Sequence, residues 1–227
     1  IVDAIKEGRT VFKNIRKFTT YQISCNYAEL FTIFVGVLIA SFFGWPFPIL
    51  LALQILFMNL VTDNIPAITL GLNSSSKDIM SEKPRKREIL NKASIKLIIF
   101  TGTIMALFTL AIFYISFNIW EIGEIQSRTT ALFSLIGLQI SGAFIFRSFR
   151  KGVFNRSPFV NKYLVYASAI SIMATLLIVY TPLSKIFETS PIGISAWAIA
   201  ISASLIFIMI FDILKKINNK KHFFKED

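Results

Sequence analysis

Six long apolar stretches, separated by short polar segments, dominate the chain. Each is long enough to cross a hydrocarbon layer of roughly 30 Å as a helix, which takes about 20 residues. None alternates apolar and polar residues with the period of two that a membrane β-barrel strand needs. The pattern therefore predicts an all-α, polytopic membrane bundle of six transmembrane helices. The predicted spans are Tyr21–Phe43, Pro48–Gly71, Ser94–Phe117, Thr129–Phe146, Tyr163–Tyr180 and Ile194–Leu214.

The Lys and Arg residues predict which way these spans run. They concentrate before the first span, between the second and third, between the fourth and fifth, and after the sixth. The other side of the predicted membrane carries only Arg128 and Lys185. Since basic residues remain on the cytoplasmic side, both termini are predicted to be cytoplasmic. Aromatic residues agree with this orientation, because Trp45, Trp120 and Trp197 fall at the outer ends of spans.

The chain divides into three predicted regions. Residues 1–20 mix apolar residues and charges in a helical rhythm, which predicts a cytoplasmic stalk that continues into the first span. Residues 21–214 form the transmembrane domain, and residues 215–227 form a basic cytoplasmic tail. The chain opens on Ile1 with neither a methionine nor a signal peptide, so we expect it to be cut from a longer protein.

Composition supports a membrane protein, since 54% of the residues are hydrophobic and the mean hydropathy is +0.63. The net charge of +11 is also compatible with a nucleic-acid partner. Nucleic-acid binders gather their charge on a polar domain, whereas these basic residues lie between apolar stretches, so we expect no nucleic-acid binding. With one cysteine, Cys25, and one histidine, His222, the chain has no internal disulfide and no cluster of soft metal ligands.

The segment Asn59-Leu-Val-Thr-Asp-Asn-Ile-Pro66 places polar residues inside the second predicted span. A carboxylate at that depth costs about 2.5–3.5 kcal/mol on insertion scales, so Asp63 needs a function or a partner. Asn59, Thr62 and Asp63 share one helix face because they are spaced i, i+3 and i+4. Pro66 removes a backbone donor and should loosen the preceding turn, which leaves carbonyl oxygens without helical partners.

The first predicted span carries a matching polar face in Asn26 and Glu29. Glu29 lies roughly 12 Å along the helix from Tyr21, and Asn59 lies roughly 16 Å from the outer end of its span. The two faces can therefore meet near mid-membrane, where side-chain oxygens and freed carbonyls would suit a hard cation. Calcium is favoured because it accepts about 6–8 oxygens in irregular geometry, whereas magnesium dehydrates reluctantly.

Other interpretations of these polar residues stay open. One is a purely structural network, although interhelical hydrogen bonds average about 0.6 kcal/mol in a membrane, little for two buried carboxylates. A second is a proton relay, to which Asn and Thr residues add little. A passive channel, a secondary carrier or a membrane scaffold would also place polar residues here. Gln139, near the middle of the fourth span, is either a further neutral cation ligand or a structural hydrogen-bonding residue.

The polar tract also resembles a known family. Asn59-Leu-Val-Thr-Asp-Asn-Ile-Pro-Ala67 is similar to the sixth transmembrane helix of P-type cation-transporting ATPases, above all calcium pumps, which usually read Asn-Leu-Val-Thr-Asp-Gly-Leu-Pro-Ala. Ile23-Ser-Cys-Asn-Tyr-Ala-Glu29 resembles their fifth helix, and the opening Ile-Val-x-Ala-Ile-x-Glu-Gly-Arg resembles the segment that joins it to the phosphorylation domain. Asp78-Ile-Met80 and Lys83-Pro-Arg85 also fit. Beyond Asn91 the resemblance depends on hydropathy and spacing.

The resemblance implies the last six of ten transmembrane helices of an ATP-driven calcium pump, an integral multi-pass membrane protein. Its partners would be the lipid bilayer, the transported cation, and upstream transmembrane helices and cytoplasmic domains of the parent chain. ATP and magnesium would act only in the parent protein, because the phosphorylation motif Asp-Lys-Thr-Gly does not occur in this sequence. The chain alone should therefore not hydrolyse ATP. The implied cation ligands are Asn26, Glu29, Asn59, Thr62 and Asp63.

Two residues depart from the family pattern. Asn64 stands where calcium pumps usually have Gly, and Asn tolerates unusual backbone angles better than most residues. Gln139 aligns with a glutamate of the eighth helix that contributes to one of two calcium sites in some members. Without that charge one site should be weaker, so the number of ions stays open. Sodium, potassium and proton pumps share the same scaffold and remain alternatives.

Overall fold

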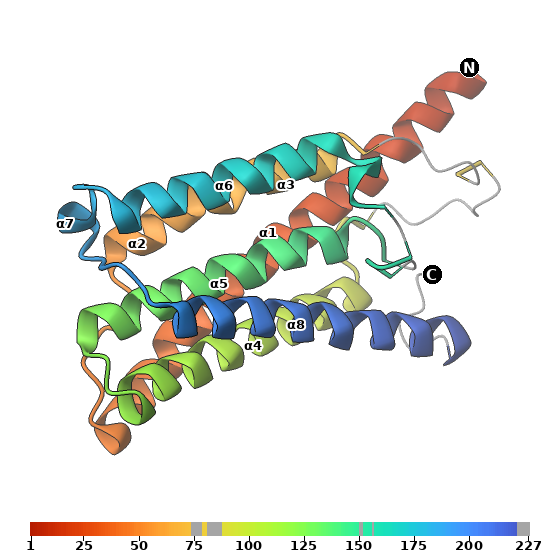
Figure 1. Cartoon of the computed structure of the whole chain (residues 1–227). Coiled ribbons are helices and arrows are strands. Elements are labelled where there is room, and N and C mark those ends of the chain that lie inside the picture. Colours follow the sequence, from red (N-terminus) through yellow and green to blue (C-terminus); the bar gives the residue numbers. More distant parts are fainter. Residues whose placement is uncertain (74–78, 81–87, 150–151, 156, 222–227) are drawn as a thin grey trace.

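A computed structural model describes residues 1–73, 79–80, 88–149, 152–155 and 157–221, and within them every regular element is a helix. Six helical segments are long and apolar enough to cross a membrane, which confirms the predicted all-α bundle (Figure 1). The elements are α1 (Val2–Phe43), α2 (Ala52–Phe57), the π-helix η1 (Met58–Thr62), α3 (Asn64–Gly71), α4 (Lys92–Tyr114), the π-helix η2 (Ile115–Ile119), α5 (Glu124–Phe146), the 3-10 helix η3 (Pro158–Val160), α6 (Lys162–Tyr180), α7 (Ser184–Phe187) and α8 (Ile194–Lys221).

Helix α1 is one unbroken helix of 42 residues, about 63 Å long at 1.5 Å per residue. Its first part reaches beyond the neighbouring helices (Figure 1), so the predicted continuity between residues 1–20 and the first span is confirmed. The helix ends at Phe43 because Gly44 adopts a left-handed conformation with φ 64° and donates its N–H to the carbonyl of Ala40.

Three span boundaries differ from the predicted ones by more than two residues. The second span begins at Ala52 rather than Pro48, because Leu51 is extended and donates its N–H to Gln54 Oε1 at 3.1 Å, which caps the helix. Helix α5 begins at Glu124 rather than Thr129. Glu124 and Arg128, four residues apart, form an ion pair, which stabilises a helix through its first turn. Helix α8 continues past Leu214 to Lys221.

Some sequence predictions fall outside the described residues. They are the family motifs at Asp78 and at Lys83–Arg85, together with residues 222–227 of the predicted tail, which include His222.

Helix α1 begins and α8 ends at the same end of the bundle (Figure 1), which we call the N-terminal end. The connections 44–51, 120–123 and 181–193 lie at the opposite end. The three tryptophans also lie there, although Trp45 is buried and donates from Nε1 to Asn118 Oδ1 at 2.6 Å instead of facing an interface. The side of the membrane that each end faces stays a prediction.

The spans differ in how deeply they are buried. Helix α5 is the most enclosed, with 78% of its apolar stretch buried, whereas the corresponding figure for α8 is 28%. Helix α5 thus forms the interior of the bundle, and α8 packs on it from outside (Figure 1). This position matters because α5 carries Gln139 into the centre.

Helices α1 and α4 approach each other closely at Gly102 of α4. A Cβ atom built at this position would lie 2.9 Å from the carbonyl oxygen of Ser24 and 2.5 Å from Cδ1 of Tyr27, both on α1. The close approach therefore depends on the missing side chain, as is common between membrane helices.

At the N-terminal end, buried polar side chains connect α1 with its neighbours. Asn14 donates from Nδ2 to the carbonyl of Asn73 at 2.7 Å, and Asn161 donates to Asn73 Oδ1 at 3.2 Å. Arg16 donates from Nε to Ser94 Oγ at 3.1 Å, which joins α1 to the start of α4. These contacts hold α1, α3, α4 and α6 together at the end where α1 leaves the bundle.

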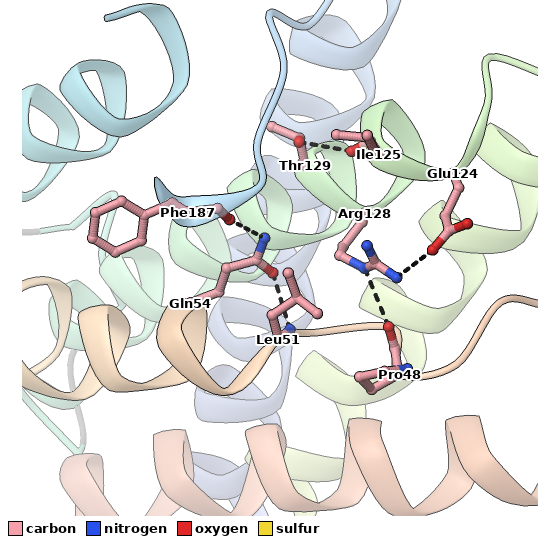
Figure 2. Close-up of polar contacts among 8 residues, drawn as sticks. All are labelled: Pro48, Leu51, Gln54, Glu124, Ile125, Arg128, Thr129 and Phe187. Carbon is pink, nitrogen blue, oxygen red and sulfur yellow. Dashed lines mark hydrogen bonds and ion pairs between the residues drawn. The ribbon is translucent and has the colours of Figure 1, made fainter. Parts of the chain in front are cut away.

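At the opposite end, Arg128 and Gln54 connect separate segments of the chain (Figure 2). Arg128, 4% exposed, donates to the carbonyl of Pro48 at 3.1 Å and to Glu124 Oε1 at 2.7 Å. Gln54 donates from Nε2 to the carbonyl of Phe187 in α7 at 2.9 Å. These bonds fix the position at which the second span begins.

Replacing Gly102 by alanine tests the α1–α4 contact. The new Cβ atom would lie too close to the backbone oxygen of Ser24 in α1, so the two helices must move apart. We expect the unfolding free energy to fall by about 1–3 kcal/mol. The measurement is thermal unfolding in detergent. Gly8→Ala is the control, since Gly8 is exposed with nothing within 4 Å of an added Cβ, and alanine favours a helix by about 1 kcal/mol. Equal melting temperatures for the two variants would contradict the contact.

Replacing Arg128 by methionine tests the opposite end. The change removes hydrogen bonds to Pro48 and Glu124 from a buried side chain, and we expect a loss of about 1.5–3 kcal/mol in the same measurement. Glu124→Gln is the matched control. The Glu124 side chain is 49% exposed, so removing only its charge should cost at most about 1 kcal/mol. A larger effect from Glu124 than from Arg128 would show that the pairing with Pro48 contributes little.

Candidate cation site

Three spans bring four polar side chains into one hydrogen-bonded network. Asn59 of η1 donates from Nδ2 to Glu29 Oε2 of α1 at 3.0 Å. Gln139 of α5 donates from Nε2 to Glu29 Oε1 at 2.9 Å and to Asp63 Oδ2 at 3.1 Å. Glu29 is 2% exposed, and Asp63 and Gln139 are fully buried. Two carboxyl groups from different helices therefore meet in the interior of the bundle.

The backbone of the second span widens where it carries these residues. Asp63 donates its N–H to the carbonyl of Met58 at 3.0 Å, one residue further back than in an α-helix. Pro66 has no N–H to offer the carbonyl of Thr62, and the Ser171 hydroxyl of α6 approaches that oxygen at 3.4 Å. The predicted loosening before Pro66 is thus confirmed, in the form of a π-turn.

The other two predicted ligands lie differently. The Thr62 hydroxyl is fully buried and donates to the carbonyl of Met58 in its own helix at 3.2 Å. Asn26 is exposed on the surface of α1. Three residues along an α-helix place Asn26 about 60° around the axis from Glu29, so both share a side without both pointing inward. The structure therefore brings together Glu29, Asn59, Asp63 and Gln139, with Thr62 adjacent and Asn26 outside.

Two oxygen atoms of the network have no hydrogen-bond donor in the described part of the chain. They are Asp63 Oδ1 and Gln139 Oε1, and both are buried. A buried acceptor without a donor costs about 1–3 kcal/mol, so each of these oxygens is available to another ligand. Backbone and side-chain oxygens of this kind are the ligands that calcium accepts.

Each of the two carboxyl groups is surrounded by neutral polar groups and by the other carboxyl group. Amides of Asn59 and Gln139, the Thr62 hydroxyl and the Cys25 thiol act on them, with no lysine or arginine among these neighbours. Among the described residues no group of three His, Cys, Asp or Glu side chains could hold a metal ion. The arrangement instead offers the carboxyl groups of Glu29 and Asp63 and the amide oxygens of Asn59 and Gln139. Two ionised carboxyl groups would match the charge of one divalent cation.

Sequence reasoning missed two residues that contact this part of the second span, one at Asp63 and one at Thr62. The buried thiol of Cys25 lies beside the Asp63 carboxyl, whereas the sequence pattern gave Cys25 no place among the polar residues of the spans. Its spacing of four residues from Glu29 places both on one helix face and was a usable signal. Ser171 has no such signal, since its role depends on how α6 packs against η1.

Comparison with known proteins identifies relatives over most of the chain. The family model described as "Cation transporting ATPase, C-terminus" matches residues 47–217. The "Calcium-transporting ATPase 1" of Bacillus cereus is 32% identical over 95% of this chain and 26% of that protein. The "Calcium-transporting ATPase" of Bacillus subtilis is 34% identical over 91% of this chain and 23% of that protein.

A mammalian relative shows a similar level of identity. The "Calcium-transporting ATPase type 2C member 1" of Mus musculus is 30% identical over 97% of this chain and 24% of that protein. The chain therefore spans about a quarter of the length of the relatives that it matches.

Proposed function

Since this chain belongs to the cation-transporting ATPases, where it matches the C-terminal membrane part, we propose that it carries the cation-binding site of an ATP-driven calcium pump. It is an integral, multi-pass membrane protein. The observation that carries the proposal is the buried pairing of Glu29 and Asp63 from two spans, linked through Gln139. Calcium as the cargo is supported by the relatives, which are named as calcium-transporting ATPases.

In this proposal the ligands come from both sides of the α1–η1 contact. Glu29 and Asp63 supply the charge that balances one divalent ion, while Asn59 contributes its side-chain oxygen after its amide turns away from Glu29. Thr62 contributes oxygen from the widened π-turn. The π-turn favours such a role, because it alters the backbone hydrogen bonding next to the carboxyl groups.

Asn26 joins the same site from the exposed side of α1. If the Asn26 amide faced hydrocarbon, its N–H donors and its oxygen would have no hydrogen-bond partners. Each polar group without a partner in an apolar medium costs on the order of several kcal/mol. We propose that an upstream transmembrane helix of the parent chain covers this face of α1 and supplies further ligands. The exposed position of Asn26, one turn from the buried Glu29, supports this partner.

The remaining parts of the pump would lie in the parent protein. We propose that residues 1–20 form a cytoplasmic stalk, that both termini are cytoplasmic, and that phosphorylation by ATP with magnesium takes place in a domain before the stalk. Helix α1 supports this coupling, since one continuous helix runs from Val2 through Glu29. A displacement of its first part therefore reaches the site without passing through a loop.

Replacing Asp63 by asparagine in the complete protein tests the site. The change keeps the shape of the side chain and removes one of two buried charges, so we expect calcium-dependent phosphorylation from ATP to disappear. The measurement is phosphoenzyme formation across a calcium titration. Glu124→Gln is the matched control, because it is the same kind of substitution on a half-exposed side chain at the opposite end of the bundle, and should leave the titration unchanged. An Asp63 variant with an unaltered calcium dependence would refute the ligand assignment.

A further inference from the structure

One nitrogen atom bonds both carboxyl groups of the network. Gln139 Nε2 lies 2.9 Å from Glu29 Oε1 and 3.1 Å from Asp63 Oδ2, and so stands between two acidic groups from different spans. A cation shared by Glu29 Oε1 and Asp63 Oδ2 would occupy the same location. These two oxygens can therefore bond either the N–H groups of Gln139 or a shared cation, but not both, because a cation repels N–H groups.

The other end of the same amide has no partner. Gln139 Oε1 is buried without a hydrogen-bond donor among the described residues. The last torsion of a glutamine side chain is broad and roughly two-fold, so turning it by half a turn exchanges the positions of oxygen and nitrogen. That turn would present an oxygen ligand in place of two donors, without any movement of the helix.

The backbone around Gln139 is held in place, so the torsion is the available movement. Helix α5 is the most enclosed span. At Gly142 an added Cβ would lie 2.7 Å from Cε at the flexible end of Met105 of α4 and 3.6 Å from the buried ring of Tyr21 of α1. A shift of α5 would disturb such contacts along its length. Rotation of one terminal amide disturbs only the hydrogen bonds that it makes itself.

We propose that the Gln139 amide is the exchange partner of the transported cation. Its N–H donors hold Glu29 and Asp63 together when they do not share a cation, and the amide turns to offer Oε1 when they do. This inference depends on the proposed cation site and adds a role for Gln139 that neither a simple ligand nor a structural residue has. A glutamate at this position would lack the donors, and a leucine would lack both donors and ligand.

Gln139→Leu in the complete protein tests the exchange. In the arrangement without a shared cation, the variant loses two hydrogen bonds from Gln139 to the acidic groups. In the arrangement with a shared cation it loses one neutral oxygen ligand. The first arrangement should therefore be destabilised more than the second. We expect the calcium concentration for half-maximal phosphorylation to fall about tenfold, which corresponds to about 1.4 kcal/mol. The melting temperature in detergent should fall with a chelator present and fall less with saturating calcium.

Gln54→Leu is the matched control. Gln54 is an equally buried glutamine whose amide groups bond Leu51 and Phe187 at the opposite end of the bundle. Its replacement should lower the melting temperature equally with calcium and with a chelator, and leave the calcium titration unchanged.

The remaining outcomes overturn the inference in distinguishable ways. A higher half-maximal calcium concentration in Gln139→Leu would make Gln139 a ligand alone, and an equal loss of stability in both buffers would make it structural. Gln139→Glu keeps an oxygen, removes the donors and adds a charge, so it should lower the half-maximal concentration further. If Asp63→Asn abolishes the calcium response while Gln139→Leu weakens calcium binding, the cation site stands and only the exchange fails. If Asp63→Asn keeps the response, the proposed function fails first.

Discussion

The burial of two carboxyl groups in the interior of a membrane protein is the constraint on which the rest of this structure depends. Glu29 and Asp63 come from different spans, and within the described part of the chain neither has a lysine or arginine among the groups that act on it. Such groups are costly at membrane depth unless neighbouring groups compensate them. The amides of Asn59 and Gln139 provide that compensation, and they require α1, η1 and α5 to remain in register with one another.

Both ends of the bundle contribute to that register. At the N-terminal end, Asn14 and Asn161 hold the segment that follows α3 between α1 and α6. At the opposite end, Arg128 holds the loop before α2 against the start of α5 (Figure 2). The second span is therefore fixed on both sides of its π-turn. Its irregular part, the π-turn, lies between two anchored ends and next to the carboxyl groups.

Much of this arrangement follows from the sequence, because apolar length and helical periodicity act locally. They predicted six spans, one continuous α1 and the weakened turn before Pro66. What they could not predict depends on packing between distant segments. The link from Gln139 to both carboxyl groups joins three spans, and the exposure of Asn26 depends on which helices surround α1. Periodicity gives the face on which a residue lies, but not which neighbour covers that face.

The two asparagines of the predicted ligand set show how the site is divided. Asn59 is already bonded to Glu29 through its amide nitrogen, inside the contact between η1 and α1. Asn26 lies about 60° around α1 from Glu29 and is exposed. One helix thus presents an acidic group to the interior of this bundle and an amide to its surface. Asn26 therefore lies at the edge of the six-helix bundle, while Glu29 and Gln139 lie inside it. The position of that edge is set by α1, the same helix that extends beyond the bundle at its N-terminal end (Figure 1).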